Sequence, residues 1–421
     1  MTTSNYLKGF WTALVLLLTL AHHSSNAQDV TSKVYGGVQL WARYTHQNPG
    51  SLQGDKPSEY YFDGSLRRYR LGVKGTVSDQ ISYNLQVGHN NLNHLNSDKA
   101  PKLLDAYVDF KISKNLALIA GKHAWTGLTR YAAPSTFSAM GTDINYHATP
   151  FLNVQDDFFR RFGVAAHGKI AKLDYRVVLA KPNSNSTAAL SENANFINDP
   201  DAVHTSGYFK WEFFDKESLS SAFSPWTYLG KKKILNIGAG FSYQSNSTEN
   251  ITSTGDSVIY DAISFGVDVL HEWQPSERWS MTWYASFIHH DLGPGFIRNI
   301  GPNNSATATT ANGYFNGKGN AFPTVGSGDL LFLQFAMLRP LKAEKESNVA
   351  IQTYVNLEYG SFEALDDPMI VYELGVNYLL KGHKSKISLG MQQRPLFMLE
   401  NGETRRSEYL GMYVLQYQVR F

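Results

Sequence analysis

The most informative charged residues of this chain lie at even spacings within one segment. Arg68, Arg70 and Lys74 are separated by even numbers of positions, so they share a face if the segment is a β-strand, where successive side chains alternate between faces. A row of cations on one face can attract an anion and still hold it weakly enough for release, which is how charged walls set the selectivity of a narrow passage. We therefore take these three residues as candidates for contact with a negatively charged solute.

Further charged residues complete this candidate site, some basic and some acidic. The acidic ones would oppose the basic ones and create a transverse field across a passage. The alternative interpretation is that all of them neutralise one another and solvate a water-filled wall, because a charged residue in a spanning segment must face water. These residues are Arg43, Arg130, Arg161, Asp143, Asp156 and Asp157.

Other groups that could do chemistry are better explained without a ligand. His289 and His290 are adjacent and would point to opposite faces of a strand, so a joint metal site is disfavoured. The Lys231–Lys233 run is interpreted as a solvated rim, and Gly313–Lys318 lacks the spacing of a phosphate-binding loop. The sequence contains no Cys and neither a G-x-S-x-G nor an H-E-x-x-H motif. We therefore expect no catalytic residue, cofactor or metal, and no enzyme activity.

The elements that would position these charges are alternating β-strands. In Leu235–Tyr243 and Tyr372–Leu380, apolar residues alternate with polar or small ones, the pattern of a strand with one face toward lipid and the other toward a lumen. The same pattern recurs over nearly the whole chain, without an intervening helical period. A content of 24 Tyr, 24 Phe, 8 Trp and 34 Gly suits such a barrel, because aromatic rings line the membrane interfaces. The sequence predicts an all-β transmembrane antiparallel β-barrel.

The connections are predicted to alternate between short turns and long loops, as expected for periplasmic turns and extracellular loops. Counting the segments gives about sixteen strands, and bacterial barrels need an even number. Asp215–Gly230 is an exception, because it lies where a short turn is due and is too long for one. The long polar stretches are 47–63, 125–157, 183–203, 246–255 and 291–328.

Both ends of the chain predict export to the outer membrane. Lys8 precedes a short apolar run, Phe10–Ala21, and a small-x-small pattern ends at Ala27, which together predict a signal peptide over residues 1–27 that is cleaved after Ala27. Residues 28–421 would then form one barrel domain. The last strand alternates aromatic or apolar residues up to Phe421, which resembles the signal that the barrel-assembly machinery of the outer membrane reads.

Several segments resemble a known family, the phosphate-selective porins O and P. The resemblance runs from about residue 33 to the end of the chain, loops excepted. The last of the segments that carry it is similar to the Bacteroidetes branch of the family. They are Arg67–Gly75, Leu104–Phe110, Arg160–Val164 with Gly168 and Tyr175, and Tyr228–Phe241.

The resemblance implies a sixteen-stranded homotrimeric porin that passes small anionic solutes, with phosphate among them. It also implies that the long segment after Gly121, here Trp125–Asp157, folds inward and narrows the lumen as a constriction loop. Thr126-Gly127-Leu128 stands where the family more often has Pro-x-Gly, so the shape of the constriction is expected to differ. The arginine ladder and lysine cluster of the family's phosphate-selective members have no residue-by-residue counterpart in this chain.

Three functions remain open from the sequence. The first is passive diffusion of small hydrophilic, anionic solutes through a water-filled channel, in contact with outer-membrane lipid and lipopolysaccharide. The alternatives are a surface or adhesion barrel that acts through its long loops, and a barrel hydrolase. The near balance of 38 basic and 36 acidic residues gives no reason to expect a nucleic-acid partner.

Overall fold

The computed structural model describes residues 31–95, 100–148, 160–182, 194–197, 199, 201–252, 254–311, 313–341 and 349–421. The predicted signal peptide and Asp156 and Asp157 lie outside the described residues. Within the described residues, no helix has the length and apolar character needed to cross a membrane.

Antiparallel β-strands build nearly all of the described structure, with one short 3-10 helix, η1 (Arg130–Ala132). The strands of the barrel wall are β1 (Thr31–His46), β4 (Tyr60–Thr76), β5 (Ile81–Leu92), β6 (Lys102–Lys111), β7 (Ala117–His123), β8 (Arg161–Ile170), β9 (Leu173–Ala180), β11 (His204–Glu212), β12 (Ile234–Ile251), β13 (Ser257–Ser276), β14 (Trp279–Asp291), β18 (Gly328–Pro340), β19 (Ala350–Phe362), β20 (Met369–Leu379), β21 (Ser385–Glu400) and β22 (Glu403–Arg420). Shorter strands lie in the connections: β2 (Ser51–Gln53), β3 (Lys56–Pro57), β10 (Ala194–Phe196), β15 (Ile297–Ile300), β16 (Ala308–Thr309) and β17 (Phe322–Gly326).

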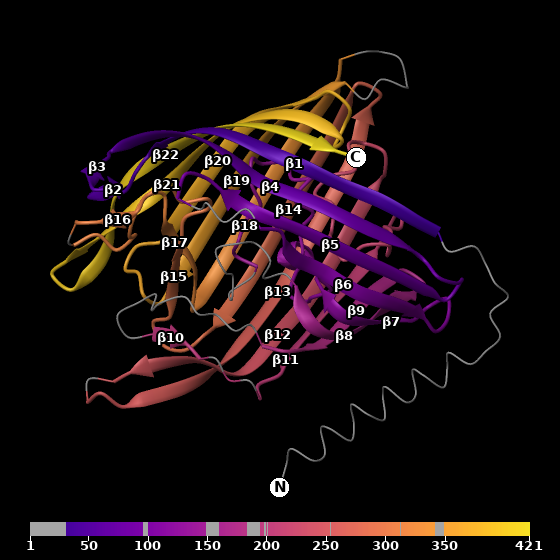
Figure 1. The fold of residues 1–421 in the computed structure, drawn as a ribbon, viewed down its shortest axis with the longest axis horizontal. Coiled ribbons are helices and arrows are strands. Elements are labelled where there is room, and N and C mark those ends of the chain that lie inside the picture. The colour runs from indigo at the N-terminus through magenta and orange to yellow at the C-terminus, as the bar shows by residue number, and fades with distance from the viewer. Residues whose placement is uncertain are drawn as a thin grey trace, which may run out of the picture.

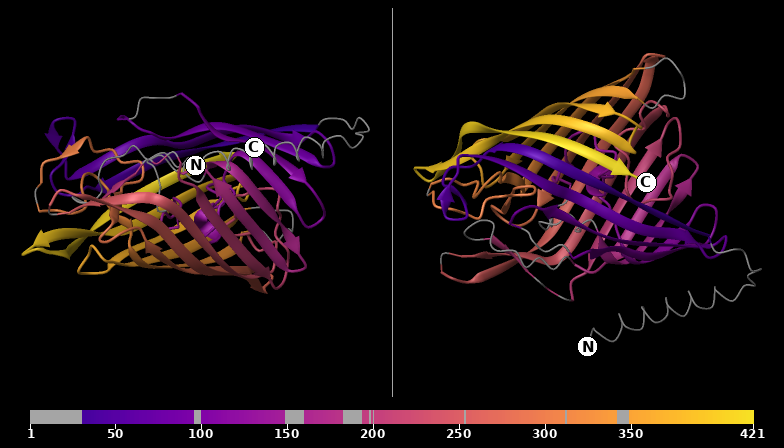
Figure 2. Two further views of the ribbon diagram at one scale, coloured as in Figure 1. Left: turned by 90° about the horizontal axis from the view of Figure 1, so that it is seen from below. Right: turned by 45° about the horizontal axis from the view of Figure 1, so that its top comes forward.

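The main sheet closes on itself, as Figures 1 and 2 show. It contains 17 strands, of which β10 pairs with the far end of β12 and the other sixteen form a closed antiparallel ring. β1 pairs with β4 on one side and with β22 on the other, in a register that runs from Gly37 opposite Arg420 to Thr45 opposite Met412. The predicted fold class and strand number are confirmed.

The predicted division between an apolar outside and a polar inside is seen along the wall strands. In β18, Leu331, Leu333 and Phe335 are exposed on the outside, whereas Phe332 and Gln334 are buried inside. Successive side chains of a β-strand point to opposite faces of the sheet. The outside can therefore contact lipid while the inside carries polar groups.

The closing strand has the same division. Tyr413, Leu415 and Tyr417 are exposed outside, as predicted. On the inner face, Trp41 Nε1 donates to Gln416 Oε1 at 2.8 Å, and a Gln39–Gln418 hydrogen bond lies beside it. The seam between the first and last strands is thus held by side chains as well as by backbone.

Two predicted loops contain more structure than expected. Most of the 246–255 stretch is strand, because β12 and β13 continue as a hairpin in which Thr248 to Ile251 pair with Tyr260 to Ser257. Backbone hydrogen bonds extend this hairpin without apolar alternation, so its sequence resembles a loop. Within 291–328, β15 pairs with β17 and β16 pairs with β2, and these pieces lie at the end of the barrel opposite the chain's C-terminus (Figure 1).

Candidate functional site: the lumen of the barrel

The segment that follows β7 folds into the lumen and places Asp143 beside two arginines of β4. Its carboxylate accepts hydrogen bonds from Arg68 Nη2 at 2.6 Å and from Arg67 Nη2 and Nε at 2.9 and 3.1 Å. Arg67 also donates to the Tyr146 hydroxyl at 2.7 Å. The predicted opposition of Asp143 to a basic strand is therefore a direct contact and not a field across open space.

Arg67 is a residue of this site that strand alternation misses. Positions 67 and 68 would point to opposite faces of a regular strand, yet both side chains are buried inside. The reason is a bulge: Gln39 pairs with Arg68 and Leu40 with Leu66, so Arg67 is passed over in the register. A bulge turns an extra side chain to the same face, and sequence periodicity does not reveal it.

Arg43 and Arg70 are also on the lumen face and are tightly held there. Arg43 makes a two-point contact with Asp63, at 2.9 Å for each hydrogen bond, and donates to the carbonyl oxygen of Asn303. Arg70 donates to the carbonyl oxygen of His89 at 2.9 Å and to the carbonyl oxygen of Tyr69 at 2.8 Å. These contacts fix the guanidinium groups as part of the wall, and their role in solute passage stays a prediction.

Arg161 and Lys74 lie on the lumen face apart from the Asp143 cluster. Arg161 begins β8 and donates to Gln244 Oε1 at 3.2 Å. Lys74 is exposed and its ammonium lies 5.7 Å from the ring centre of Tyr35. The structure therefore places the predicted basic residues around the lumen, and it does not join them into one track of neighbouring contacts.

Arg130, predicted to face a solute, instead binds the long segment between β11 and β12. Its guanidinium makes a two-point contact with Glu217, at 2.6 and 2.5 Å, and donates to the Pro225 carbonyl oxygen at 2.7 Å. Its backbone N–H donates to Asp268 at 2.6 Å. These contacts hold the Arg130 guanidinium between the two segments, and its role in solute passage stays a prediction.

Glu217 is the centre of a buried ionic network inside the barrel. Besides Arg130 it binds Lys210 Nζ at 2.6 Å, Asn236 Nδ2 at 2.7 Å and the Tyr228 hydroxyl at 2.5 Å. Burial alone would raise the pKa of Glu217, but the charges of Arg130 and Lys210 outweigh burial and hold that pKa well below its usual range. The carboxylate is therefore ionised, and the network is a set of charge-assisted hydrogen bonds.

The network extends to the wall through Lys169 of β8. Its ammonium donates to both carboxylate oxygens of Glu212, at 2.7 and 2.6 Å, and lies 3.4 Å from Asp174. Glu212 in turn accepts from the backbone N–H of Glu217 at 3.0 Å. The segment after β11 is thus tied to three neighbouring wall strands, and charge is balanced between the Lys and Arg side chains and the carboxylates.

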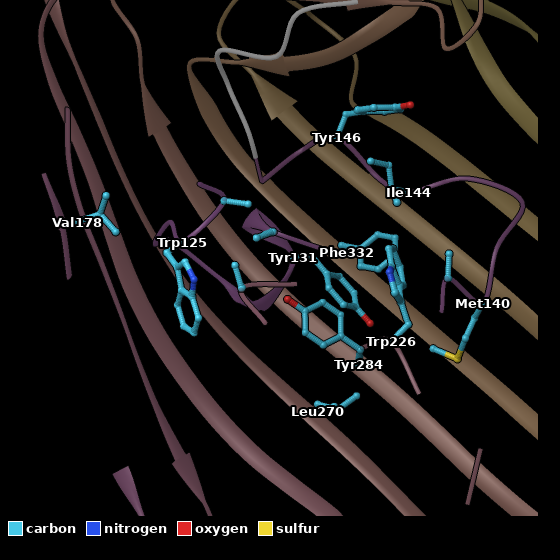
Figure 3. Packing of buried hydrophobic residues seen from close by; sticks show 14 of the residues in the cluster. Trp125, Tyr131, Met140, Ile144, Tyr146, Val178, Trp226, Leu270, Tyr284 and Phe332 are labelled. Carbon is cyan, nitrogen blue, oxygen red and sulfur yellow. The ribbon is translucent and has the colours of Figure 1, made fainter. Parts of the chain in front are cut away.

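The segments after β7 and after β11 also meet through backbone and aromatic contacts. Ser135 N donates to the Ser224 carbonyl and Ser224 N to the Ala133 carbonyl, both at 2.9 Å. The rings of Tyr131 and Trp226 stack at 3.9 Å between centroids, and Tyr284 of the wall lies 4.1 Å from Tyr131. Figure 3 shows these rings gathered inside the curved sheet. The described part of the predicted constriction loop, up to residue 148, does fold inward, and the middle of the 213–233 segment, with Glu217, Ala222 and Trp226 buried, folds inward to meet it.

We call this pair of segments, 213–233 and 128–138, the clamp. In the sequence, the clamp is indicated only by the 215–230 segment, which is too long for a turn. That length is the one signal that could have located the clamp, since a chain of this size at the end of a barrel must either project into water or fold into the lumen. Among the described residues, no group of three or more His, Asp or Glu side chains is arranged to hold a metal ion.

The closed sixteen-strand barrel with an inward loop places this chain in the class of outer-membrane porin folds. Residues 33–127 match the family described as phosphate-selective porin O and P. This match includes the Arg67–Gly75 and Leu104–Phe110 segments, so the predicted resemblance is confirmed there. A search of curated proteins finds no match.

Solved structures of bacterial outer-membrane proteins share the fold. The trimer form of OmpT from Vibrio cholerae superimposes with a TM-score of 0.51 at 10% sequence identity, covering 94% of this chain and 100% of that one. The outer-membrane channel DcaP of Acinetobacter baumannii gives a TM-score of 0.50 at 12% identity, covering 95% of this chain and 99% of that one.

Proposed function

We propose that this protein is an outer-membrane porin, which passes small hydrophilic solutes by diffusion and prefers anions. The observation that carries the proposal is a closed barrel with an apolar outside, a charged inside and an inward loop across the lumen. A barrel of this size encloses an aqueous channel rather than a solid core. Its activity is therefore transport without a catalytic step.

The anion preference rests on the arginines of the wall and on the family match. Arg43, Arg67, Arg68 and Arg70 all lie on the inner face of neighbouring strands β1 and β4. The matched residues 33–127 belong to a family described as phosphate-selective. Phosphate and other small anions are thus the first solutes to test.

The export, assembly and oligomeric state of the channel are inferred from the sequence and from the family resemblance. We infer that the chain is exported with a cleaved signal peptide, inserted by the barrel-assembly machinery through the strand ending at Phe421, and surrounded by lipid and lipopolysaccharide. A homotrimer is inferred from the family resemblance, and the OmpT structure from Vibrio cholerae is a trimer form. Crosslinking of the native outer membrane tests the trimer directly.

Conductance in a planar lipid bilayer tests the proposed function. The purified protein should insert with discrete conductance steps in KCl, and a salt gradient should give a reversal potential on the anion-selective side. Inserted protein that never conducts would refute the porin. A conducting channel with a cation-selective reversal potential would refute only the anion preference.

A further inference from the structure

The outward-facing tryptophans of the described structure gather in one sector of the barrel wall. The other described tryptophans are buried inside. Those on the outer face belong to β11, β13 and β14, and they are Trp211, Trp273, Trp279 and Trp283. All four lie toward the barrel end that carries the C-terminus, where β11 and β13 end and β14 begins. Because an indole ring prefers the level of lipid headgroups, this sector meets one membrane interface with an aromatic belt.

Two exposed cations lie in this belt. Arg339 ends the outer face of β18, and its guanidinium carbon lies 5.5 Å from the ring centre of Trp279. Lys233 directly precedes β12, and its ammonium lies 4.3 Å from the ring centre of Phe214, which is 44% exposed. Within the described residues, neither cation forms an ion pair with a carboxylate. Both positive charges are therefore available to a ligand on the outer surface.

The same sector carries the opposite charge at its other end. Asp261, Asp291 and Asp329 are exposed toward the far ends of β13, β14 and β18. The sequence has no Lys or Arg between Lys233 and Arg278, so the cations flanking β12 and β13 are confined to the end with the aromatic belt. Such a separation of charge attracts an anion to one interface of the membrane and not to the other.

The wall next to the two cations is apolar. On the outer face of β18, Arg339 is followed toward the middle of the barrel by Met337, Phe335 and Leu333, and the last two are 37% and 39% exposed. A ligand that contacts both the cations and this wall needs an anionic head and a long apolar tail. Free phosphate lacks the tail, and an acidic protein segment does not extend along a wall that faces lipid. An anionic phospholipid has both parts.

We propose that Lys233 and Arg339, within the belt of outward tryptophans, bind the headgroup phosphate of an anionic phospholipid. Only β13 and β14 separate the strands of the two cations, a distance of about 14 Å, so one headgroup lies between them. Its phosphate oxygens accept charge-assisted hydrogen bonds, and its acyl chains lie along the outer faces of β14 and β18. The site rests on the membrane-spanning barrel of the proposed function and is independent of the solute that passes the lumen.

The test places the full-length barrel in bilayers that mix phosphatidylglycerol with phosphatidylcholine. One of the two lipids carries bromine on its acyl chains, which quenches the fluorescence of a tryptophan in contact with it. We expect brominated phosphatidylglycerol to quench more strongly than brominated phosphatidylcholine at the same mole fraction. The preference should be at least about fivefold, the effect of one cation at a charged lipid surface, and it should fall as NaCl is raised.

Matched double variants assign the preference to the two cations. Lys233→Gln with Arg339→Gln should make the two lipids quench nearly alike, since both headgroup contacts are lost. Lys56→Gln with Lys318→Gln is the control, because it removes two exposed cations from the opposite end of the barrel. The control changes the net charge by the same amount and should keep the preference.

Each outcome supports or overturns the site. A barrel that conducts KCl and is quenched equally by both lipids overturns the site and leaves the porin intact. Equal loss of preference in the two double variants overturns the placement, and so does sodium phosphate that abolishes the preference where NaCl of equal ionic strength does not. The chain has no Cys, so oxidation of Lys233→Cys that links two barrels would assign the belt to a second copy and also overturn the site. If the first double variant does not fold, Arg339→Gln compared with Lys318→Gln decides, and quenching decides the site even if the barrel never conducts.

Discussion

The inward loop is held in two different ways along its length, and the difference lies in how completely its buried polar groups are paired. Near Arg130 it meets a network in which cations and carboxylates pair within hydrogen-bonding distance. Near Asn145 it borders a small cavity, and both side-chain amide atoms of Asn145 are buried without a hydrogen-bond partner within the described structure. A fully paired buried network stiffens the fold, whereas an unpaired buried polar group destabilises it. The inward loop is therefore held more firmly at the clamp than at Asn145.

The largest effect is expected from removing the centre of the clamp. Glu217→Leu leaves Arg130 and Lys210 buried without their shared carboxylate, which typically costs about 3–5 kcal/mol for a buried pair. We expect residues 213–233 to leave the lumen, with a higher single-channel conductance and a lower temperature of unfolding on semi-native gels. Glu403→Gln is the control, because its ion pair with Arg405 is exposed. Unchanged conductance in Glu217→Leu would show that the clamp does not narrow the passage.

A smaller effect is expected where the inward loop passes close to the wall. A Cβ added at Gly127 would lie 2.5 Å from backbone atoms of Gly207 in β11, so Gly127→Ala must push the loop from the strand, at a typical cost of 1–3 kcal/mol. Gly64→Ala is the control, since the nearest atom would be 3.9 Å away. Conductance and thermal stability should change in the first variant and not in the second. Equal behaviour of the two would contradict this close approach.

The charges around Asp143 should change the ion selectivity of the channel. Asp143→Asn removes the negative member of the cluster with Arg67 and Arg68, so the anion-to-cation permeability ratio should rise, by roughly fivefold at most for one charge at contact distance in water. Arg68→Gln should lower the same ratio. Reversal potentials in a KCl gradient measure both. Shifts of the same sign would show that these charges act only through the shape of the wall.

The smallest effect is expected from pH within the range where porins are usually measured. The pKa of Glu217 is held well below its usual range, so the stability that its ionised form contributes is present above the pKa of unfolded Glu, about 4.3. That contribution is lost only when the pH falls through the lower, folded pKa. Conductance should thus be unchanged from neutral to mildly acidic pH and should rise in strong acid. A rise near neutral pH would contradict an ionised Glu217.

Much of the wall could be predicted because its rule is local. Leu331, Leu333 and Phe335 alternate with inward residues, and this alternation by itself shows which face meets lipid. The inward placement of Arg68 follows from the same rule. Arg67 does not follow this alternation, because a bulge depends on how β4 pairs with β1. The sequence of one strand does not show how it pairs with its neighbour.

The sequence by itself determined that the chain makes strands with an apolar face and a charged face, and how many strands there are. Only the tertiary structure decided which charges meet. Arg130 and Glu217 are 87 positions apart, and Asp143 is 76 positions from Arg67. Closure of the barrel brings such residues together, and the inward path of two connections selects the pairs. Neither closure nor that path leaves a periodic trace in the sequence, because both depend on contacts between distant segments.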